Sequence, residues 1–262
     1  MDLGLRDKIV LVTGGAKGIG AATVEAFSAE DCKVVLVDRD AETGMALEKA
    51  LGSRVRYIEA DLTNTEACKK AIEQTVSVFG GLDVLVNNAG FNDGLGLDAP
   101  PEDFMISVQN NLLHVYAMTH YALPLLRKGQ GCLVNLGSKV SETGQGHTSA
   151  YAAAKGAISA LTREWAVALA PDKIRVNCVI PAECLTDQYE QFFLSQVEPE
   201  AAKKAISKLV PFAQRLTTPQ EIAQTIVFLA SDRSSHTTGQ LVFVDGGYTH
   251  FDRAVGHGHN KW

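Results

Sequence analysis

Short apolar runs alternate with amphipathic stretches along most of the chain. Runs rich in β-branched residues occupy residues 8–13, 33–37, 55–59, 83–86, 132–136, 174–179 and 241–244. Continuous apolar runs of this length are typical of parallel strands buried on both faces. Helical spacing of apolar residues covers about 19–29, 41–51, 64–79, 103–127 and 149–169. The alternation predicts an α/β fold, a doubly wound (Rossmann) parallel sheet of about seven strands with helices on both faces.

One polar, helical stretch interrupts this rhythm, at about residues 182–215, between the sixth and seventh predicted strands. Ligands of open α/β sheets bind beyond the carboxyl ends of the strands. We therefore expect residues 182–215 to form a lid over a ligand site. No linker, repeat or low-complexity tract divides the sequence, which favours a single domain over residues 1–262.

The composition excludes several classes of protein. Of the 262 residues, 46% are hydrophobic and 21% are charged, as in globular proteins, which excludes disorder as the main state. The net charge of −6 leaves no basic surplus to neutralise phosphates, so we expect no nucleic-acid partner. The longest apolar runs are too short to cross a membrane, and residues 1–8 lack the apolar core of a secretion signal.

Cysteine and histidine usage points away from disulfides and metals. The five cysteines are odd in number and form no Cys-x-x-Cys pair; they are Cys32, Cys68, Cys132, Cys178 and Cys184. This pattern predicts a reduced, cytoplasmic setting without structural zinc. Two histidines, His257 and His259, lie near the C-terminal end with no acidic or cysteine cluster beside them. We interpret them as part of a solvated terminus and expect no metal site.

A glycine-rich loop, Thr13–Gly20 (TGGAKGIG), joins the first predicted strand to the first helix. Glycines allow a sharp turn and a close approach to a pyrophosphate, and the helix N-terminus supplies free N–H groups. A glycine cluster alone is weak evidence, because the alternative is an ordinary tight turn between a strand and a helix. Asp38, however, ends the second strand 18 residues after Gly20, where a carboxylate can bind ribose hydroxyls. Together they predict a dinucleotide site.

The charges around Asp38 bear on the choice between NAD and NADP. The Asp38 carboxylate would repel a 2′-phosphate, which favours NAD. Lys17 and Arg39 carry positive charge that favours NADP. We expect Asp38 to prevail because its charge would stand at hydrogen-bond distance from the 2′-oxygen, so the predicted cofactor is NAD and the alternative is NADP.

Tyr151 and Lys155 lie four residues apart, which on a helix places both on one face. A free tyrosine has a pKa of about 10, and lowering it by about three units takes roughly 4 kcal/mol. Lys155 and a cationic nicotinamide ring together supply charge of the right sign. The pair alone is a common surface pattern. Here Ser138 ends the fifth strand, Asn87–Gly90 ends the fourth, and Asn111 lies in the long helix between them.

With these motifs together, the sequence resembles the classical short-chain dehydrogenase/reductase family from about residue 6 to 249. The matching motifs are TGxxxGxG at Thr13–Gly20, Asp61-Leu62, NNAG at Asn87–Gly90, the tetrad Asn111, Ser138, Tyr151 and Lys155, the segment Asn177…Pro181…Thr186, and Val244–Gly247. The resemblance implies a nicotinamide-dependent oxidoreductase. Family members usually pair the helix that carries Tyr151 with its copy, which implies a homotetramer.

The resemblance also implies residue roles. Tyr151 acts as general base in oxidation and general acid in reduction, and Ser138 binds the substrate oxygen. Lys155 holds the nicotinamide ribose and lowers the pKa of Tyr151, and Asn111 anchors a water that passes the proton to solvent. The implied cofactor-binding residues are Gly14, Lys17, Gly18, Ile19, Gly20, Asp38, Arg39, Asp61, Leu62, Asn88, Ala89, Gly90, Tyr151, Lys155, Pro181 and Thr186.

The sequence departs from the family pattern at two positions. Gly137 precedes the catalytic serine where a serine is common, and this costs little because Ser138 is the catalytic one. Pro181 is followed by Ala182 where the family has glycine. The extra methyl of Ala182 stiffens the turn beside the nicotinamide.

Polar side chains gather in the loops expected to face the substrate. Asn92 follows the fourth strand, Gln145 and His147 precede Tyr151, and Glu183 follows the sixth strand. With Ser138 and Tyr151, we predict that these residues contact a polyhydroxylated substrate. The alternative for each loop residue is a hydrogen bond to backbone or water.

A closer resemblance, to the bacterial L-fucose dehydrogenases within this family, involves residues 92–98, 162–169, 180–183, 235–239 and 243–250. It implies oxidation of the C1 hydroxyl of L-fucose or a related aldose to a lactone, although those enzymes lack an acid at the position of Asp38. One alternative is a carbonyl reductase acting on keto-sugars or another secondary alcohol or ketone. Another is a non-catalytic nucleotide-sensing protein, against which the Tyr151–Lys155 spacing counts.

Overall fold

The sheet that the apolar runs predict is present in the computed structural model, which describes residues 1–251. Its strands are β1 (Ile9–Thr13), β2 (Lys33–Asp38), β3 (Val55–Glu59), β4 (Val84–Asn87), β5 (Cys132–Leu136), β6 (Arg175–Pro181) and β7 (Leu241–Val244). All neighbours pair in parallel, in the order β3-β2-β1-β4-β5-β6-β7. The order reverses between β1 and β4, so the carboxyl ends of these two strands flank a crevice.

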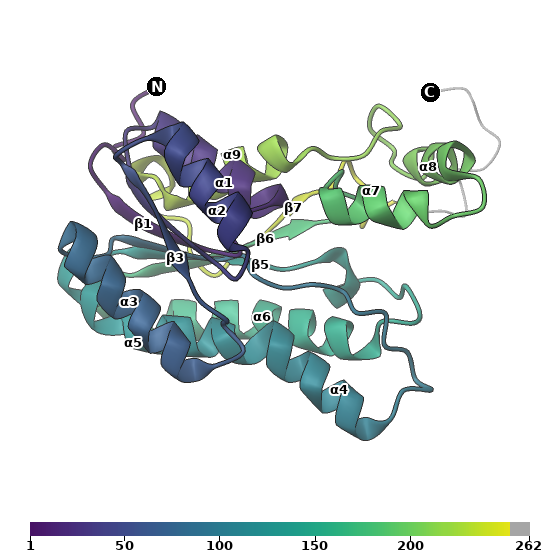
Figure 1. Ribbon diagram of the computed structural model, residues 1–262, viewed down its shortest axis with the longest axis horizontal. Coiled ribbons are helices and arrows are strands. Elements are labelled where there is room, and N and C mark those ends of the chain that lie inside the picture. The colour runs from purple at the N-terminus through teal and green to yellow at the C-terminus, as the bar shows by residue number, and fades with distance from the viewer. Residues whose placement is uncertain (252–262) are drawn as a thin grey trace.

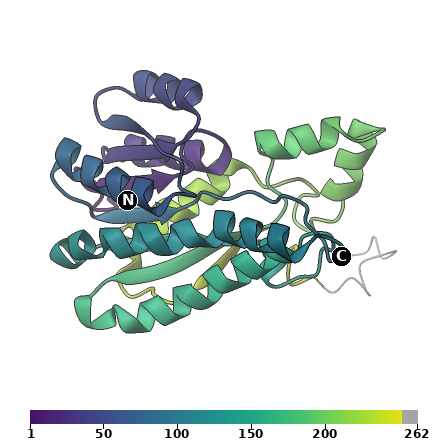
Figure 2. The ribbon, with the colours of Figure 1, turned by 60° about the horizontal axis from the view of Figure 1, so that its bottom comes forward.

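Helices cover both faces of the sheet, as predicted (Figures 1 and 2). The helices are α1 (Gly18–Ala29), α2 (Ala41–Leu51), α3 (Thr65–Phe79), α4 (Pro101–Val108), α5 (His114–Gly129), α6 (Ser149–Ala168), α7 (Asp187–Leu194), α8 (Pro199–Ser207) and α9 (Pro219–Ala230). In Figure 1, α1, α2 and α9 lie above the sheet and α3 to α6 lie below it.

Side chains of β1 explain why its apolar run is continuous. Val10 and Val12 belong to the core cluster that contains Phe27 of α1, whereas Leu11 belongs to the cluster that contains Met118 of α5. Successive residues of a strand point to opposite faces, so a strand packed on both sides needs apolar residues throughout.

Helix α9 lies outside the stretches that apolar spacing predicts to be helical, although its start carries a local signal. The side chain of Thr218 accepts a hydrogen bond from the backbone N–H of Glu221, and the Glu221 carboxylate accepts one from the N–H of Thr218. Pro219 occupies the first helical position. This capping box, a threonine followed three residues later by a glutamate, marks the helix start in the sequence.

The long helix predicted over 103–127 is two helices joined by a π-helical turn, Gln109–Leu113. Within this turn the Asn111 side chain is buried and accepts a hydrogen bond from the N–H of Phe91 at 2.9 Å. It donates to the carbonyl of Ser107 at 3.1 Å. A π turn inserts one residue into the helix, and here it directs Asn111 toward the loop after β4. Apolar periodicity carries no signal for such a turn.

The insertion predicted at 182–215 contains α7 and α8, which lie beyond the carboxyl ends of the strands (Figure 1). Backbone hydrogen bonds close its base: the N–H of Leu185 donates to Thr217 at 2.8 Å, and that of Thr217 to Glu183 at 2.9 Å. Both ends of the insertion are therefore attached to one point near the end of β6.

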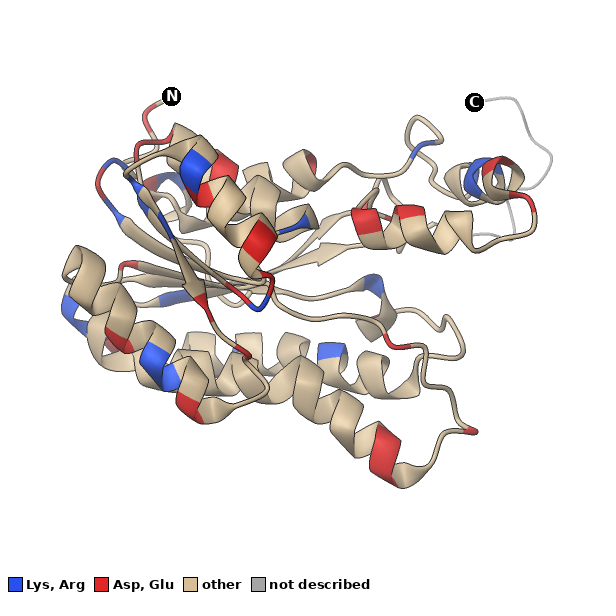
Figure 3. Cartoon of the chain, in the orientation of Figure 1, with Lys and Arg blue, Asp and Glu red and all other residues tan. Residues whose placement is uncertain are grey.

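Over residues 1–251, no helix has the length and apolar character needed to cross a membrane. The same part of the chain contains no group of three or more His, Cys, Asp or Glu side chains placed to hold a metal. Positive and negative side chains are interspersed on α2, α3 and α8 (Figure 3). His257 and His259 lie outside the described residues.

Candidate active site

A pocket of about 1030 Å³ opens at the carboxyl ends of the strands. Every predicted cofactor-binding residue lines it, from Gly14 in the glycine loop to Thr186 before α7. The predicted substrate residues Asn92, Ser138, Gln145, His147 and Glu183 line it as well. Asn111 does not; it lies behind the pocket wall, in the π turn. The fold thus gathers residues from most of the chain into one cavity large enough for a dinucleotide and a small molecule.

The glycine loop leaves its backbone accessible at the crevice. Gly14 and Gly18 have positive φ angles of 62° and 54°, which glycine adopts readily. A Cβ atom on Gly20 would lie 1.9 Å from the carbonyl oxygen of Gly14, so no larger residue fits. Asn88 holds the loop against β4 by donating to the carbonyls of Thr13 and Gly14, both at 2.9 Å. This cradle fits the close approach of a pyrophosphate.

Asp38 is held by backbone N–H groups at the end of β2. Its carboxylate accepts hydrogen bonds from the N–H groups of Ala16 and Asp40, both at 3.1 Å. Lys17 forms an ion pair with Asp40 at 2.5 Å. The hydrogen bond with Lys17 lowers the pKa of Asp40 to about 2. The positive charge of Lys17 is therefore partly balanced by Asp40, and both Lys17 and Asp38 line the pocket.

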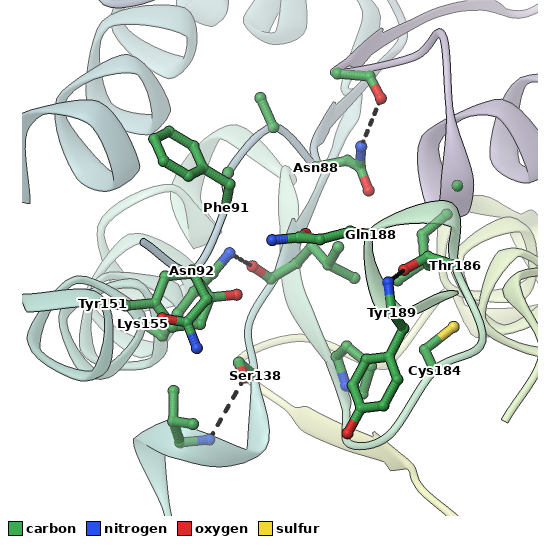
Figure 4. Close-up of a pocket in the computed structure, with 18 of the residues that line it drawn as sticks. Asn88, Phe91, Asn92, Ser138, Tyr151, Lys155, Cys184, Thr186, Gln188 and Tyr189 are labelled. Atoms are coloured by element: carbon green, nitrogen blue, oxygen red, sulfur yellow. Dashed lines mark hydrogen bonds between the residues drawn. The ribbon is translucent and has the colours of Figure 1, made fainter. Parts of the chain in front are cut away.

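The pocket is lined by Ser138, Tyr151 and Lys155 (Figure 4). Ser138 follows β5, and the other two lie one turn apart on α6. Lys155 is only 2% exposed, and its ammonium donates a hydrogen bond to the carbonyl of Leu136 at 2.8 Å. The ammonium lies 5.5 Å from the centroid of the Tyr151 ring. The predicted spacing on one helix face thus yields a buried tyrosine–lysine pair.

Burial is the largest influence on the pKa values of both Tyr151 and Lys155. It raises the pKa of Tyr151 to about 12, although hydrogen bonding with Ser138 opposes that change. Burial also lowers the pKa of Lys155 to about 8. Burial raises the pKa of Tyr151 because the phenolate loses its hydration. The expectation that Lys155 and a cationic nicotinamide ring together lower the pKa of Tyr151 stays a prediction. At neutral pH Tyr151 is a protonated phenol.

Asn111 shapes the pocket from behind. Its hydrogen bond to Phe91 holds the backbone that follows Gly90. A Cβ atom on Gly90 would lie 3.2 Å from Asn111 Oδ1 and 3.4 Å from Lys155 Nζ. The absence of that atom lets the loop, the amide and the ammonium pack together. The water expected on Asn111 stays a prediction.

The comparisons with known proteins identify the family. A family model described as enoyl-(acyl carrier protein) reductase matches residues 14–249. The chain belongs to the short-chain dehydrogenase/reductase family. It is therefore an oxidoreductase that uses a nicotinamide cofactor.

Several dehydrogenases, two of them with sugar-related names, are similar over nearly the whole chain. L-fucose dehydrogenase of Mus musculus is 37% identical, covering 92% of this chain and 88% of that protein. The crystal structure of Cj0485 dehydrogenase has a TM-score of 0.93 and 43% identity, covering 97% of this chain and 99% of that one. The ligand-free structure of Thermoplasma acidophilum aldohexose dehydrogenase has a TM-score of 0.87 and 30% identity. The similarity covers 95% of this chain and 96% of that one.

The two departures from the family pattern differ in their structural setting. In this short-chain dehydrogenase/reductase, a Cβ atom on Gly137 would lie 2.3 Å from Cδ1 of Ile180 and 2.9 Å from Sγ of Cys178. Glycine at 137 therefore leaves the space that Ile180 fills. Ala182 lines the pocket beside Pro181.

The predicted substrate residues have unequal environments. Glu183 is buried and paired with Lys139 and Tyr189. Asn92 accepts a local hydrogen bond from the N–H of Gly94 at 3.1 Å, while Gln145 and His147 are exposed.

Sequence reasoning missed three polar residues that line the same end of the pocket, Lys139, Tyr189 and Tyr248. The position of Lys139, directly after Ser138, was an available signal. Tyr189 in α7 and Tyr248 after β7 carry no signal in local pattern, because only the tertiary fold brings them there.

Proposed function

We propose that this short-chain dehydrogenase/reductase oxidises the C1 hydroxyl of an aldose, L-fucose or a related sugar, to the lactone, with NAD as cofactor. The observation that carries the proposal is the buried polar wall formed by Lys139 and Glu183 beside Ser138. An acyl or steroid pocket needs apolar walls there, whereas a wall of charged hydrogen-bonding groups suits a polyhydroxylated ring. The names of the similar dehydrogenases support the same substrate class.

The proposed roles follow from the pocket geometry. Ser138 donates a hydrogen bond to the C1 oxygen, and Tyr151 exchanges the proton of that hydroxyl. Lys155, fixed by the carbonyl of Leu136, holds the nicotinamide ribose. When bound, NAD accepts the hydride from C1, and its positive ring favours the phenolate form of Tyr151. Asn111 anchors the water through which the proton leaves.

The remaining predicted residues hold the cofactor. The backbone of the glycine loop binds the pyrophosphate, Asp38 binds the adenosine ribose, and Asp61-Leu62 lies at the adenine end. The preference for NAD rests on the Asp38 carboxylate and on the pairing of Lys17 with Asp40. Arg39, which also lines the pocket, is the residue that favours the alternative, NADP.

We also propose that residues 182–215 act as a lid, that the chain is one functional domain, and that it works as a cytoplasmic homotetramer. Gln188, Tyr189 and Phe192 of α7 line the pocket, which supports the lid. Exposed apolar side chains on α4 to α6 support the assembly, among them Met105 and Val167, which are 61% and 77% exposed. Sedimentation at the mass of one chain would exclude the tetramer.

The test of the proposed function is a panel of aldoses, simple secondary alcohols and ketones, monitored by the absorbance of the reduced cofactor. We expect kcat/KM with NAD to be at least about 100-fold higher on L-fucose or a related aldose than on a simple secondary alcohol, because a polar site rejects substrates that leave its groups unpaired. Turnover only of ketones with reduced cofactor would establish the reductase instead. Cofactor binding without turnover would establish a nucleotide sensor.

A further inference from the structure

A cluster of three polar side chains forms the pocket wall on the lid side of Ser138. Lys139 begins the short helical turn after Ser138, Glu183 follows β6, and Tyr189 lies on α7. One oxygen of the Glu183 carboxylate accepts a hydrogen bond from the Lys139 ammonium, and the other accepts one from the Tyr189 hydroxyl. In the view of Figure 4, Tyr189 and Tyr151 approach the pocket from opposite sides, with Ser138 between them.

The charges of this cluster are almost completely removed from water. Lys139 and Glu183 are 7% and 6% exposed, and both line the pocket. Burying an ion pair costs desolvation that its mutual attraction does not always repay, and apolar residues of similar volume often stabilise a fold better. A buried pair on the wall of a cavity, rather than inside the core, therefore points to a ligand.

The hydrogen bonds within the cluster set its polarity. The Lys139 ammonium has three donors; one bonds Glu183, and the ring of Tyr248 lies 4.4 Å away. The Tyr189 hydroxyl donates its only proton to Glu183, so toward a ligand its oxygen can only accept a hydrogen bond. Burial and the Glu183 charge raise the pKa of Tyr189, which keeps this phenol protonated. The wall thus offers one strong donor and one acceptor.

We propose that Lys139 donates to one ring hydroxyl of the sugar and Tyr189 accepts from another, while Glu183 is a positioning residue that orients both. The inference rests on the proposed aldose oxidation, and it names the residues that select a polyhydroxylated ring. A hydroxyl group both donates and accepts, so two hydroxyls of one ring match the opposite polarities of the two side chains. Each oxygen of Glu183 accepts a hydrogen bond from one of these two side chains, so we assign Glu183 the role of holding both in place.

The test compares hydroxyl dependence between the wild type and two variants. The double variant Lys139→Met/Glu183→Gln removes both charges together, so no unpaired buried charge remains. Tyr189→Phe removes one oxygen and keeps the ring that packs against Phe192 and Phe193. Lys204→Met, on the exposed part of α8, is the matched control. Each protein is assayed on the preferred aldose, on its 2-, 3- and 4-deoxy analogues, and on 2-hydroxytetrahydropyran.

In the wild type and in Lys204→Met, we expect kcat/KM to fall by about 100-fold or more on at least one deoxy analogue, because a buried donor or acceptor loses its partner. In the double variant, we expect the deficit for the hydroxyl that Lys139 binds to shrink to about threefold. In Tyr189→Phe, we expect the deficit for the other hydroxyl, which donates to Tyr189, to shrink by the same amount. The loss on the full aldose should be mainly in KM. The affinity for NAD should stay within about twofold of the wild type in every protein.

The results separate a failure of the hydroxyl-binding role from a failure of the proposed aldose oxidation. Aldose turnover with the same deoxy-sugar deficits in wild type and variants would overturn the hydroxyl-binding role and leave the proposed function standing. A wild type that oxidises no aldose would instead overturn the proposed function. If the double variant does not fold, Tyr189→Phe alone decides, because it changes one atom.

Discussion

Replacing Tyr151 with phenylalanine is expected to lower kcat by about 10³-fold, at the middle of the range for a general acid–base group. The ring would still fill its buried site on α6, and Lys155 would keep its hydrogen bond to Leu136. The substitution removes only the hydroxyl that we propose exchanges the proton of the substrate. The measurement is kcat with saturating aldose and NAD, accompanied by a fluorescence titration of NADH to show that cofactor binding persists.

Tyr121→Phe is the matched control, since Tyr121 lies on α5 and does not line the pocket. It should retain kcat within about twofold. Full turnover by Tyr151→Phe would contradict the mechanism. So would an equal loss in both variants, which would point to a general effect of removing a phenol.

Replacing Asp38 with asparagine is expected to shift the ratio of kcat/KM for NADP over NAD upward by about 10²–10³-fold. Two unit charges 4 Å apart interact by about 4 kcal/mol at an effective dielectric constant of 20, so removing the carboxylate removes a repulsion of that order against a 2′-phosphate. Asparagine keeps an oxygen that can accept from the N–H of Ala16 or Asp40. Kinetics with each cofactor at constant ionic strength measure the ratio.

Glu59→Gln provides the control for the loss of one nearby negative charge. Glu59 pairs with Asp38 in the register of β2 and β3, is exposed, and does not line the pocket. Its variant should change the cofactor ratio by less than about threefold, since exposed charges are strongly screened. An unchanged ratio in Asp38→Asn would show that Asp38 does not face the 2′-oxygen.

The periodicity of the sequence predicted most of the fold correctly. Apolar runs located all seven strands found within residues 1–251, because a strand buried on both faces must be apolar at successive positions. The π turn at Asn111 and helix α9 were missed for different reasons. The first depends on hydrogen bonds to Phe91 and Ser107. The second was signalled by the capping box at Thr218 rather than by periodicity.

Spacing along single elements also predicted much of the pocket. The glycine loop, Asp38 and the Tyr151–Lys155 pair each act through neighbours a few residues away in one loop or on one helix face, so their pattern is visible in the linear sequence. The sequence by itself therefore determined the fold class, the glycine loop and the placement of Tyr151 and Lys155 on one helix face.

Only the tertiary structure decided how Lys139, Glu183 and Tyr189 meet, and that Tyr189 gives its proton to Glu183. It also decided that burial raises the pKa of Tyr151. Hydrogen-bond partners between distant segments and the loss of water around a side chain depend on how the elements pack, and no local pattern of residues encodes either quantity.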